Sequence, residues 1–387
     1  MKLDGLRVID LSLFYPGPLL SQTMADHGAE VIDVEPPGGE ASRTIGPMFD
    51  GISVWYRNMH RGKRSLCLDL KQAQGRELLL RLAETADVVI EGFRPGVVDR
   101  LGVGYEAVAA RNPKIVYCSI SAFGQSGPLS DRPAHDMGVQ ALAGILALNQ
   151  GRDGNPTAPS LPHSDISASL FGLSGILMAL LAAQRTGTGD YLDIAMFDTL
   201  LACAPNIMGP ALAENRPNEP KQERLWGGNA LYRLYETADG QWLVLAGAEA
   251  KFAKTLLTDL GRPDLIAAAC GPHGHGQQPV RDFLDAAFKQ KTLAEWEAWL
   301  GARDLAWAPL LTLDKALASD HAAARGMLIQ DADGRPQIGP ALPFRNDPPS
   351  PDTRVPRTGA DNEALAREAG FDDTAIAAMR EQGALFC

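Results

Sequence analysis

The feature that most constrains the fold is an alternation of short apolar runs with amphipathic runs across residues 6–121. Residues 6–10 and 30–35 have the pattern of buried strands, and residues 18–27 between them have that of a helix, with Gly or Pro at each break. The alternation continues through strands predicted at 65–70, 87–90 and 114–121 and a helix at 72–85. Repeated βαβ units predict an α/β fold, a parallel sheet with helices on both faces.

A second, smaller domain is expected after this part, because 387 residues are enough for two cores. Residues 215–223 are polar and contain proline, which is typical of a linker. Beyond them, apolar runs at 231–235 and 242–245 flank the turn Ala238-Asp239-Gly240 and predict a β-hairpin. Helices predicted after the hairpin complete a small α+β unit.

Composition excludes several classes of protein. With 45% hydrophobic and 21% charged residues the chain resembles an ordinary globular protein, and its net charge of -11 argues against a nucleic-acid binder. The five cysteines form no CxxC pair, so no disulfide framework or zinc site is expected. Residues 1–10 lack the pattern of a cleavable leader, so we expect a cytoplasmic protein. The apolar stretch 170–183 is interpreted as a buried helix too short for a membrane span.

The loop after the first strand argues against a dehydrogenase. A dinucleotide-binding fold carries G-x-G-x-x-G at this point, whereas this chain has Tyr15-Pro16-Gly17-Pro18. No metal site is expected either, because His273 and His275 lack a third ligand.

Three polar residues are candidates for proton transfer. His135 lies in the run Arg132-Pro133-Ala134-His135-Asp136, Asp165 opens a helix predicted over 165–185, and Glu249 follows the predicted hairpin. A His, an Asp and a Glu in one cleft could move a proton next to a carbonyl. The helix dipole would keep Asp165 ionised, but a plain N-cap would look the same, and His135 could equally be a cap or a buried hydrogen-bonded group.

Positive charges gather in two segments. One contains Arg57, His60, Arg61, Lys63 and Arg64, and the other contains Arg94 and Arg100. Together they could hold a polyanionic small molecule, although a solvated basic turn would give the first cluster equally well.

With these residues in view, the chain resembles the family III CoA transferase superfamily, of the CaiB/BaiF type, over essentially its whole length. The resemblance rests on residues 6–35, on Lys63-Arg64-Ser65 with Asp69-Leu70-Lys71, on Glu91-Gly92-Phe93-Arg94-Pro95-Gly96 and on residues 121–128. It implies an interlocked homodimer in which each chain forms a ring threaded by its partner. It also implies a large domain from residues 1–200 and 325–387, a linker over 201–224 and a small domain over 225–324.

Active-site motifs are most similar to those of 2-methylacyl-CoA racemases, mainly because His135 precedes Asp136. The resemblance implies an acyl-CoA thioester substrate and no prosthetic group. His135 and Asp165 would be the two acid/base groups, and Glu249 would orient His135. Arg94 would bind the CoA phosphates, with Arg43, Arg61, Lys63 and Arg100 as further CoA contacts.

Two alternatives stay open. In the transferase branch, Asp165 would be a nucleophile that carries CoA between two carboxylic acids through an anhydride and a thioester, without an acid/base His. A non-catalytic CoA-binding protein could also keep the fold. Neither reading requires a metal, a nucleic acid or a membrane.

Overall fold

The computed structural model describes residues 1–386, which form two compact units. Unit 1 contains Met1–Ala143, Pro159–Cys203 and the described residues from Asp320 on, and unit 2 contains Gly144–Ala158 and Ala204–Ser319. Most of the stretch 201–224, predicted to be a linker, is instead part of unit 2. It folds into η3 (Pro205–Ile207), α9 (Gly209–Ala213) and η4 (Arg224–Trp226).

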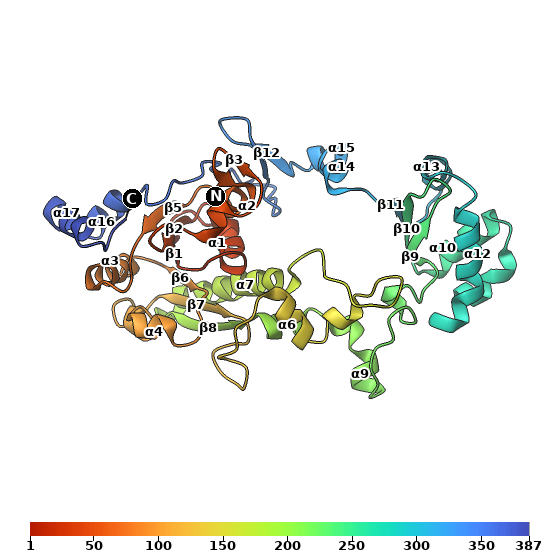
Figure 1. Ribbon diagram of the computed structural model, residues 1–387, viewed down its shortest axis with the longest axis horizontal. Coiled ribbons are helices and arrows are strands. Elements are labelled where there is room, and N and C mark those ends of the chain that lie inside the picture. Colours follow the sequence, from red (N-terminus) through yellow and green to blue (C-terminus); the bar gives the residue numbers. More distant parts are fainter. Residues whose placement is uncertain (387) are drawn as a thin grey trace. The chain divides into compact units, whose positions relative to one another are not determined.

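Unit 1 is built on a six-stranded sheet in which all strand pairs are parallel, which confirms the predicted α/β class (Figure 1). The order across the sheet is β5-β2-β1-β6-β7-β8. Counted along the chain within this sheet, that order is 3-2-1-4-5-6, the doubly wound arrangement. The strands are β1 (Arg7–Asp10), β2 (Glu30–Glu35), β5 (Arg64–Cys67), β6 (Val88–Glu91), β7 (Val116–Ser121) and β8 (Asp190–Ala195).

Each face of this sheet has its own apolar core, because successive strand residues point to opposite faces. Val8 belongs to the core that contains residues of α1 (Pro16–Asp26) and α7 (His163–Thr186). Ile9 belongs to the other core, with residues of α3 (Ala73–Ala83), α16 (Asn362–Glu368) and α17 (Asp373–Glu381). Both ends of the chain therefore contribute to unit 1.

Helix α7 differs from its prediction in two ways. It has 24 residues and is long and apolar enough to cross a membrane. Only a third of its most apolar 18-residue stretch is buried. One face of α7 packs closely against α1: a Cβ at Gly172 would come 2.7 Å from Leu20 Cδ1. On the other face Met178 and Leu181 are 69% and 63% exposed. The argument that this stretch is too short for a span was wrong, since the helix continues on both sides of it.

Shorter elements of unit 1 lie between the main strands and helices. Helices α6 (Asp136–Leu142) and α8 (Met196–Ala202) both contact α7. These elements are η1 (Ala41–Thr44), β3 (Met48–Phe49), β4 (Ile52–Ser53), α2 (Val54–His60), α4 (Val97–Leu101), α5 (Tyr105–Ala109), α6 (Asp136–Leu142), α8 (Met196–Ala202), α15 (Asp320–Ala324), β12 (Leu328–Gln330) and β13 (Pro336–Ile338).

Unit 2 has a three-stranded antiparallel sheet in the order β11-β10-β9. Its core contains the aromatic side chains Tyr235, Phe288 and Trp296, with Tyr235 and Phe288 ring centroids 4.9 Å apart. Its elements are η2 (Leu146–Leu148), β9 (Tyr232–Glu236), β10 (Trp242–Ala246), α10 (Ala250–Asp259), η5 (Pro263–Leu265), α11 (Ile266–Ala269), η6 (Gly274–Gln277), α12 (Gln278–Phe288), α13 (Leu293–Gly301), β11 (Trp307–Pro309) and α14 (Leu313–Leu317).

Candidate active site

A cavity of about 540 Å³ lies at the carboxyl ends of the parallel strands of unit 1. Its walls come from the loops after β1, β6 and β7, and strands β1 and β6 are where the order of the sheet reverses. The two chain directions leave a crevice at such a point, and doubly wound folds bind ligands there. Among the residues that line it are Ser12, Leu13, Phe14, Tyr15, Phe93, Arg94, Arg132, His135 and Asp165.

The last residue of each central strand holds the loop that follows it. Asp10 Oδ1 accepts the Ser12 N–H at 2.9 Å, and Glu91 Oε2 accepts the Phe93 N–H at 2.7 Å. The start of α1 packs closely against the loop after β1, because a Cβ at Gly17 would come 1.9 Å from Ser12 Oγ. The glycine in Tyr15-Pro16-Gly17-Pro18 thus allows α1 to start directly behind the cavity wall.

His135 is exposed and occupies the N-cap position of α6, but its side chain makes no capping hydrogen bond. The imidazole faces Phe14, with ring centroids 6.2 Å apart and ring planes at 88°. A role for His135 as a capping side chain is therefore not supported.

Asp165 is half-buried and is the third residue of α7, with Pro162 at the N-cap position. The interpretation of Asp165 as the N-cap was therefore wrong. Burial, together with the negative charge of Asp136, raises the pKa of Asp165 to about 7. We expected the helix dipole to keep this carboxyl ionised, but loss of hydration and a neighbouring acid favour its protonated form. Both protonation states are accessible near neutral pH.

Asp136, which the sequence analysis gave no role, connects the helices that carry His135 and Asp165. Its Oδ1 accepts the N–H of Ser164 at 2.9 Å and the Ser164 hydroxyl at 2.7 Å, and its Oδ2 accepts from Gln140 Nε2 at 2.7 Å. A single buried carboxylate thus joins the N-terminus of α6 to that of α7. An Asp in the first turn of a helix was the only sequence signal for this role.

Replacing Asp136 with Asn should lower the pKa of Asp165 while leaving the two helices joined. The amide oxygen of Asn can still accept from Ser164, and Gln140 Oε1, which is buried without a partner among residues 1–386, could accept from the new NH₂ group after an amide flip. Removal of the negative charge favours the ionised form of Asp165. The limb of the pH–rate profile that belongs to Asp165 should move to lower pH, and an unchanged limb with an intact fold would contradict this assignment.

His135 and Asp165 are brought together in unit 1. Both line the main cavity and a second cavity of about 310 Å³, whose other walls include Phe14, Tyr15 and Trp55. Glu249 belongs to unit 2, where it is exposed at the N-cap position of α10. Its predicted pairing with His135 therefore stays a prediction.

The predicted CoA contacts fall into two groups. Arg94 lines the main cavity and Arg100 lies in the last turn of α4, both are exposed, and neither forms an ion pair within residues 1–386. Arg132 lines the same cavity and is also exposed, although the sequence analysis gave it no role.

The cations of the second group form ion pairs within unit 1. The alternative of a solvated basic turn was therefore wrong. Burying a cation is costly unless a carboxylate lies next to it, and each of these side chains has one. The pairs are Arg43 with Glu35, Arg61 with Asp26, Lys63 with Asp10, and Arg57 with Asp331. The CoA contacts predicted for Arg43, Arg61 and Lys63 remain predictions. Among residues 1–386, the cations that line the cavity and form no ion pair are Arg94 and Arg132.

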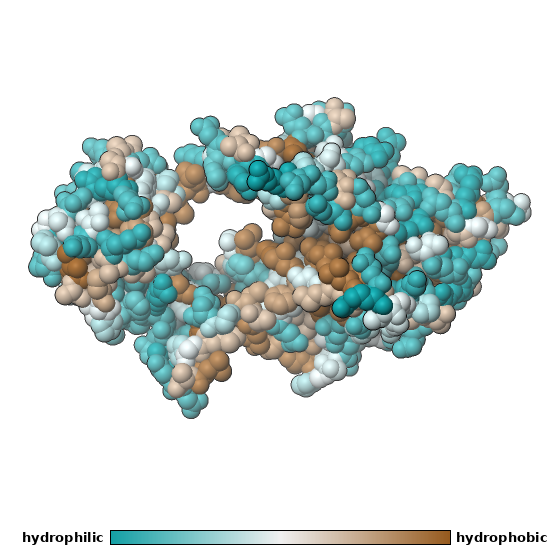
Figure 2. Space-filling model, turned by 180° about the vertical axis from the view of Figure 1, so that it is seen from behind, coloured by the Kyte–Doolittle hydropathy of each residue, from teal (hydrophilic) through white to brown (hydrophobic). Residues whose placement is uncertain are grey.

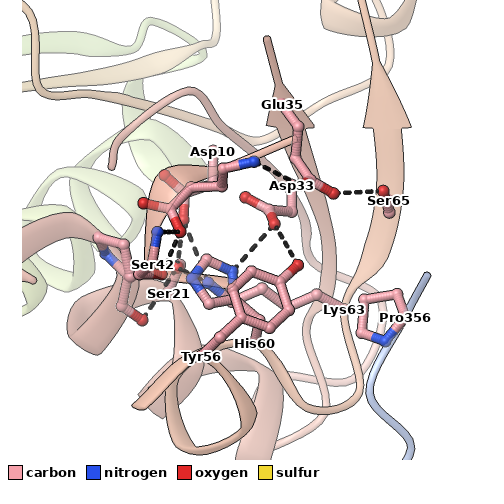
Figure 3. Close-up of polar contacts among 12 residues, drawn as sticks. Asp10, Ser21, Asp33, Glu35, Ser42, Tyr56, His60, Lys63, Ser65 and Pro356 are labelled. Atoms are coloured by element: carbon pink, nitrogen blue, oxygen red, sulfur yellow. Dashed lines mark hydrogen bonds and ion pairs between the residues drawn. The ribbon is translucent and has the colours of Figure 1, made fainter. Parts of the chain in front are cut away.

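Beside these pairs lies a buried polar network on β1, β2 and α2 (Figure 3). His60 Nδ1 is 2.9 Å from Asp33 Oδ2, and the Tyr56 hydroxyl donates to the same oxygen at 3.3 Å. Burial raises the pKa of Asp33 to about 7 and lowers the pKa of His60 well below its usual value. His60 is therefore neutral at neutral pH, and the network joins α2 to β2.

A narrower apolar cleft of about 280 Å³ lies next to the main cavity and shares Leu13 and Phe93 with it. It runs over the carboxyl ends of β2 and β5, and Lys71 lies on its wall. Within residues 1–386, no group of three or more His, Cys, Asp or Glu residues could hold a metal ion.

Comparison with known proteins gives one consistent result. The sequence model of CoA-transferase family III matches residues 3–362. The chain is 33% identical to an acetyl-CoA:oxalate CoA-transferase of Acetobacter aceti, covering 94% of this chain and 95% of the relative. It is 34% identical to the human alpha-methylacyl-CoA racemase, covering 96% and 94%. The crystal structure of a CaiB/BaiF family protein from Brucella suis superposes with a TM-score of 0.83 at 31% identity, covering 95% and 99%.

Proposed function

The chain belongs to CoA-transferase family III, and from that premise we propose that it exchanges the α-proton of an acyl-CoA thioester in the manner of a 2-methylacyl-CoA racemase. It is an enzyme, since the racemases and the CoA transferases among its relatives are both enzymes. The observation that carries the proposal is the pairing of His135 with Asp165 around shared cavities, with a pKa of about 7 for Asp165.

Two-base proton transfer accounts for this pair. A neutral His135 takes the α-proton from one face of the substrate carbon, and protonated Asp165 returns a proton to the opposite face. The opposite enantiomer uses ionised Asp165 as the base and the His135 imidazolium as the acid. An acid/base group works best with a pKa near the working pH, and Asp165 meets that condition.

The intermediate is an enolate, whose oxygen needs hydrogen-bond donors. At the start of α7, the Ser164 N–H donates to Asp136 and the Ile166 N–H donates to Pro162 O. Two of the first N–H groups of this helix are therefore unavailable to substrate. The Tyr15 hydroxyl is a suitable donor, because Tyr15 lines both cavities and keeps its proton: burial and, to a smaller extent, the charge of Asp165 raise the pKa of Tyr15.

Acyl-CoA recognition is supported by the two adjacent clefts, which share Leu13 and Phe93. The main cavity would take the acyl thioester, and the apolar cleft over β2 and β5 is suited to stacking against the flat adenine ring at the other end of the ligand. Arg94 and Arg132 at the cavity and Lys71 at the cleft would bind the phosphates between them.

Arg94→Ala should therefore weaken binding of CoA by about 1.5 to 3 kcal/mol, as expected for the loss of a charge-assisted phosphate contact. Titration calorimetry with CoA measures this directly. Arg345→Ala is the matched control, because Arg345 is an exposed arginine of unit 1 outside both clefts. Equal affinity in the two variants would assign Arg94 to the solvated surface.

The second candidate function is CoA transfer between two carboxylic acids, favoured by the similarity to the Acetobacter aceti CoA-transferase. In that reaction, ionised Asp165 attacks the thioester carbonyl and forms an anhydride with release of CoA thiolate. The thiolate then attacks the aspartyl carbonyl and releases the first acid, leaving a thioester on Asp165. A non-catalytic CoA-binding role is the least supported, since His135 and Asp165 are both present at one cavity.

One experiment separates these functions. The purified protein is incubated with a panel of acyl-CoA thioesters in deuterated buffer, with and without an acceptor acid. The masses of the substrates and of the protein are then measured by mass spectrometry. Deuterium at the α-carbon without an acceptor supports the racemase. A CoA adduct on Asp165 with no α-exchange would show the transferase instead.

We also propose a homodimer. The exposed face of α7 carries Leu170, Phe171, Met178 and Leu181, and Figure 2 shows apolar side chains gathered on the surface of unit 1. An apolar patch of this kind marks an interface, and a second copy would cover it. Sedimentation should then give twice the chain mass of 41.4 kDa.

The four described cysteines are unpaired, which supports the proposed cytoplasmic location. The proposed reaction requires no prosthetic group.

A further inference from the structure

Phe14, in the loop after β1, has an unusual backbone conformation. Its φ of 66° lies in the left-handed region, where a bulky side chain is rare. Of the other non-glycine residues with positive φ within residues 1–386, Asp50 and Asn215 are of the types that enter this region readily. Such a conformation persists when the surroundings hold it, and it is found mainly at functional sites.

Glu40 is the residue that holds it. Its Oε1 accepts the Phe14 N–H at 3.0 Å, while Oε2 accepts the Ser42 N–H at 2.8 Å. Glu40 is only 2% exposed, and its own N–H donates to Glu35 Oε2 at 2.9 Å. Glu35 is bound in turn by Arg43, which fixes the Glu40 backbone, while the Ser42 hydroxyl also donates to the Glu40 carboxylate.

Phe14 transmits this restraint to the active site. Its ring meets the His135 imidazole edge to face, at 6.2 Å between centroids, and lies 6.3 Å from the Trp55 ring. Tyr15, the next residue, lines both cavities together with Phe14 and Asp165. A change of the Phe14 backbone would therefore move a neighbour of His135 and a wall of the cavity at once.

We propose that Glu40 is a positioning residue of the active site: its carboxylate holds the Phe14 backbone in the left-handed conformation, and the Phe14 ring sets the orientation of His135. Glu40 does not line either cavity and contacts no reacting group. This proposal rests on the proposed function only for the rate of α-proton exchange; the measurements on the His135 side chain do not depend on it.

The test compares Glu40→Gln and Glu40→Ala with Asp331→Asn in the full-length protein. Gln keeps one acceptor oxygen in place of two, so it should give the milder effect. Asp331 is a matched control, because it is a buried carboxylate of unit 1 whose ion pairs are with Arg57 and Arg335, away from the cavities. Each protein is examined by melting, by NMR titration of the His135 imidazole, by carbethoxylation of His135, and by the rate of α-proton exchange.

Both Glu40 variants should change the titration and the modification rate of His135, whereas Asp331→Asn should lower only the melting temperature. The kcat for exchange should fall about ten- to hundredfold with little change in KM, the effect expected when a reacting group is displaced by about 1 Å. Unaltered His135 titration and reactivity in both Glu40 variants would overturn the inference. If the Ala variant does not fold, the Gln variant decides. If the parent protein shows no exchange, the proposed function fails, and the two His135 measurements still decide the role of Glu40.

Discussion

Asp165→Ala is expected to abolish turnover, with a loss of about a thousandfold or more in kcat, under either mechanism considered for this chain. The racemase loses the acid/base group on one face of the substrate carbon, and the transferase loses its nucleophile. The measurement is interconversion of the two enantiomers in one assay and CoA transfer to an acceptor acid in the other. Asp190→Ala is the matched control, because Asp190 is exposed at the start of β8, at the opposite end of the sheet from the cavity.

The same variant has an expected effect on stability that distinguishes chemistry from folding. The pKa of Asp165 is about 7 in the folded protein against 3.8 for the ordinary group, so the folded state binds the proton more tightly than the unfolded state. The wild-type protein therefore loses stability as the pH rises from about 4 to about 7. Removing the carboxyl removes this loss, and the melting temperature of Asp165→Ala at pH 8 should be no lower than that of the parent. A collapsed melting curve, or substantial residual turnover, would take Asp165 out of the chemistry.

His135→Ala is expected to lower α-proton exchange from one enantiomer by about a hundredfold or more, while acyl-CoA binding changes little. The reason is that only proton transfer needs a titratable group on this face of the substrate carbon. Exchange is followed by mass spectrometry from each pure enantiomer, and binding by calorimetry. The asymmetry between enantiomers is the diagnostic result, since a simple loss of folding would reduce both equally.

His163→Ala is a strict control for this variant, because His163 is an exposed histidine at the start of α7 that lines neither cavity. It should keep the exchange rate of the parent protein. If His135→Ala still moves CoA between two carboxylic acids and traps a thioester on Asp165, the racemase assignment is wrong and the protein is a transferase.

Much of unit 1 could be predicted because its signals are local. Strands covered on both faces are continuous apolar runs, and β1, β2 and β6 lie within a residue or two of their predicted ranges. Helix α7 was predicted from the helical spacing of its apolar residues, which is also a local signal. Its exposed apolar face was not predicted. Periodicity shows that a helix has apolar residues, whereas only the packed structure shows which of them find a neighbour.

The basic residues show where local reasoning fails. Lys63 and Asp10 are 53 positions apart in the chain, and their pairing depends on the adjacency of β1, β2 and the loop before β5. A cluster of cations along the sequence was interpreted as an anion site; in unit 1 these cations form ion pairs with buried carboxylates, and their contact with CoA remains a prediction. The sequence carries no sign of that, because burial and pairing are properties of the fold.

The fold class and the family could be predicted from the sequence, and His135 and Asp165 could be identified there as candidates for the chemistry. The tertiary structure alone decided how those groups behave. The carboxylate of Asp136 joins their helices, burial raises the pKa of Asp165 to about 7, and Glu40 holds Phe14 against His135. The physical reason is that residue type and local pattern fix what a side chain can do, whereas hydration, neighbouring charge and orientation depend on residues that only folding brings near.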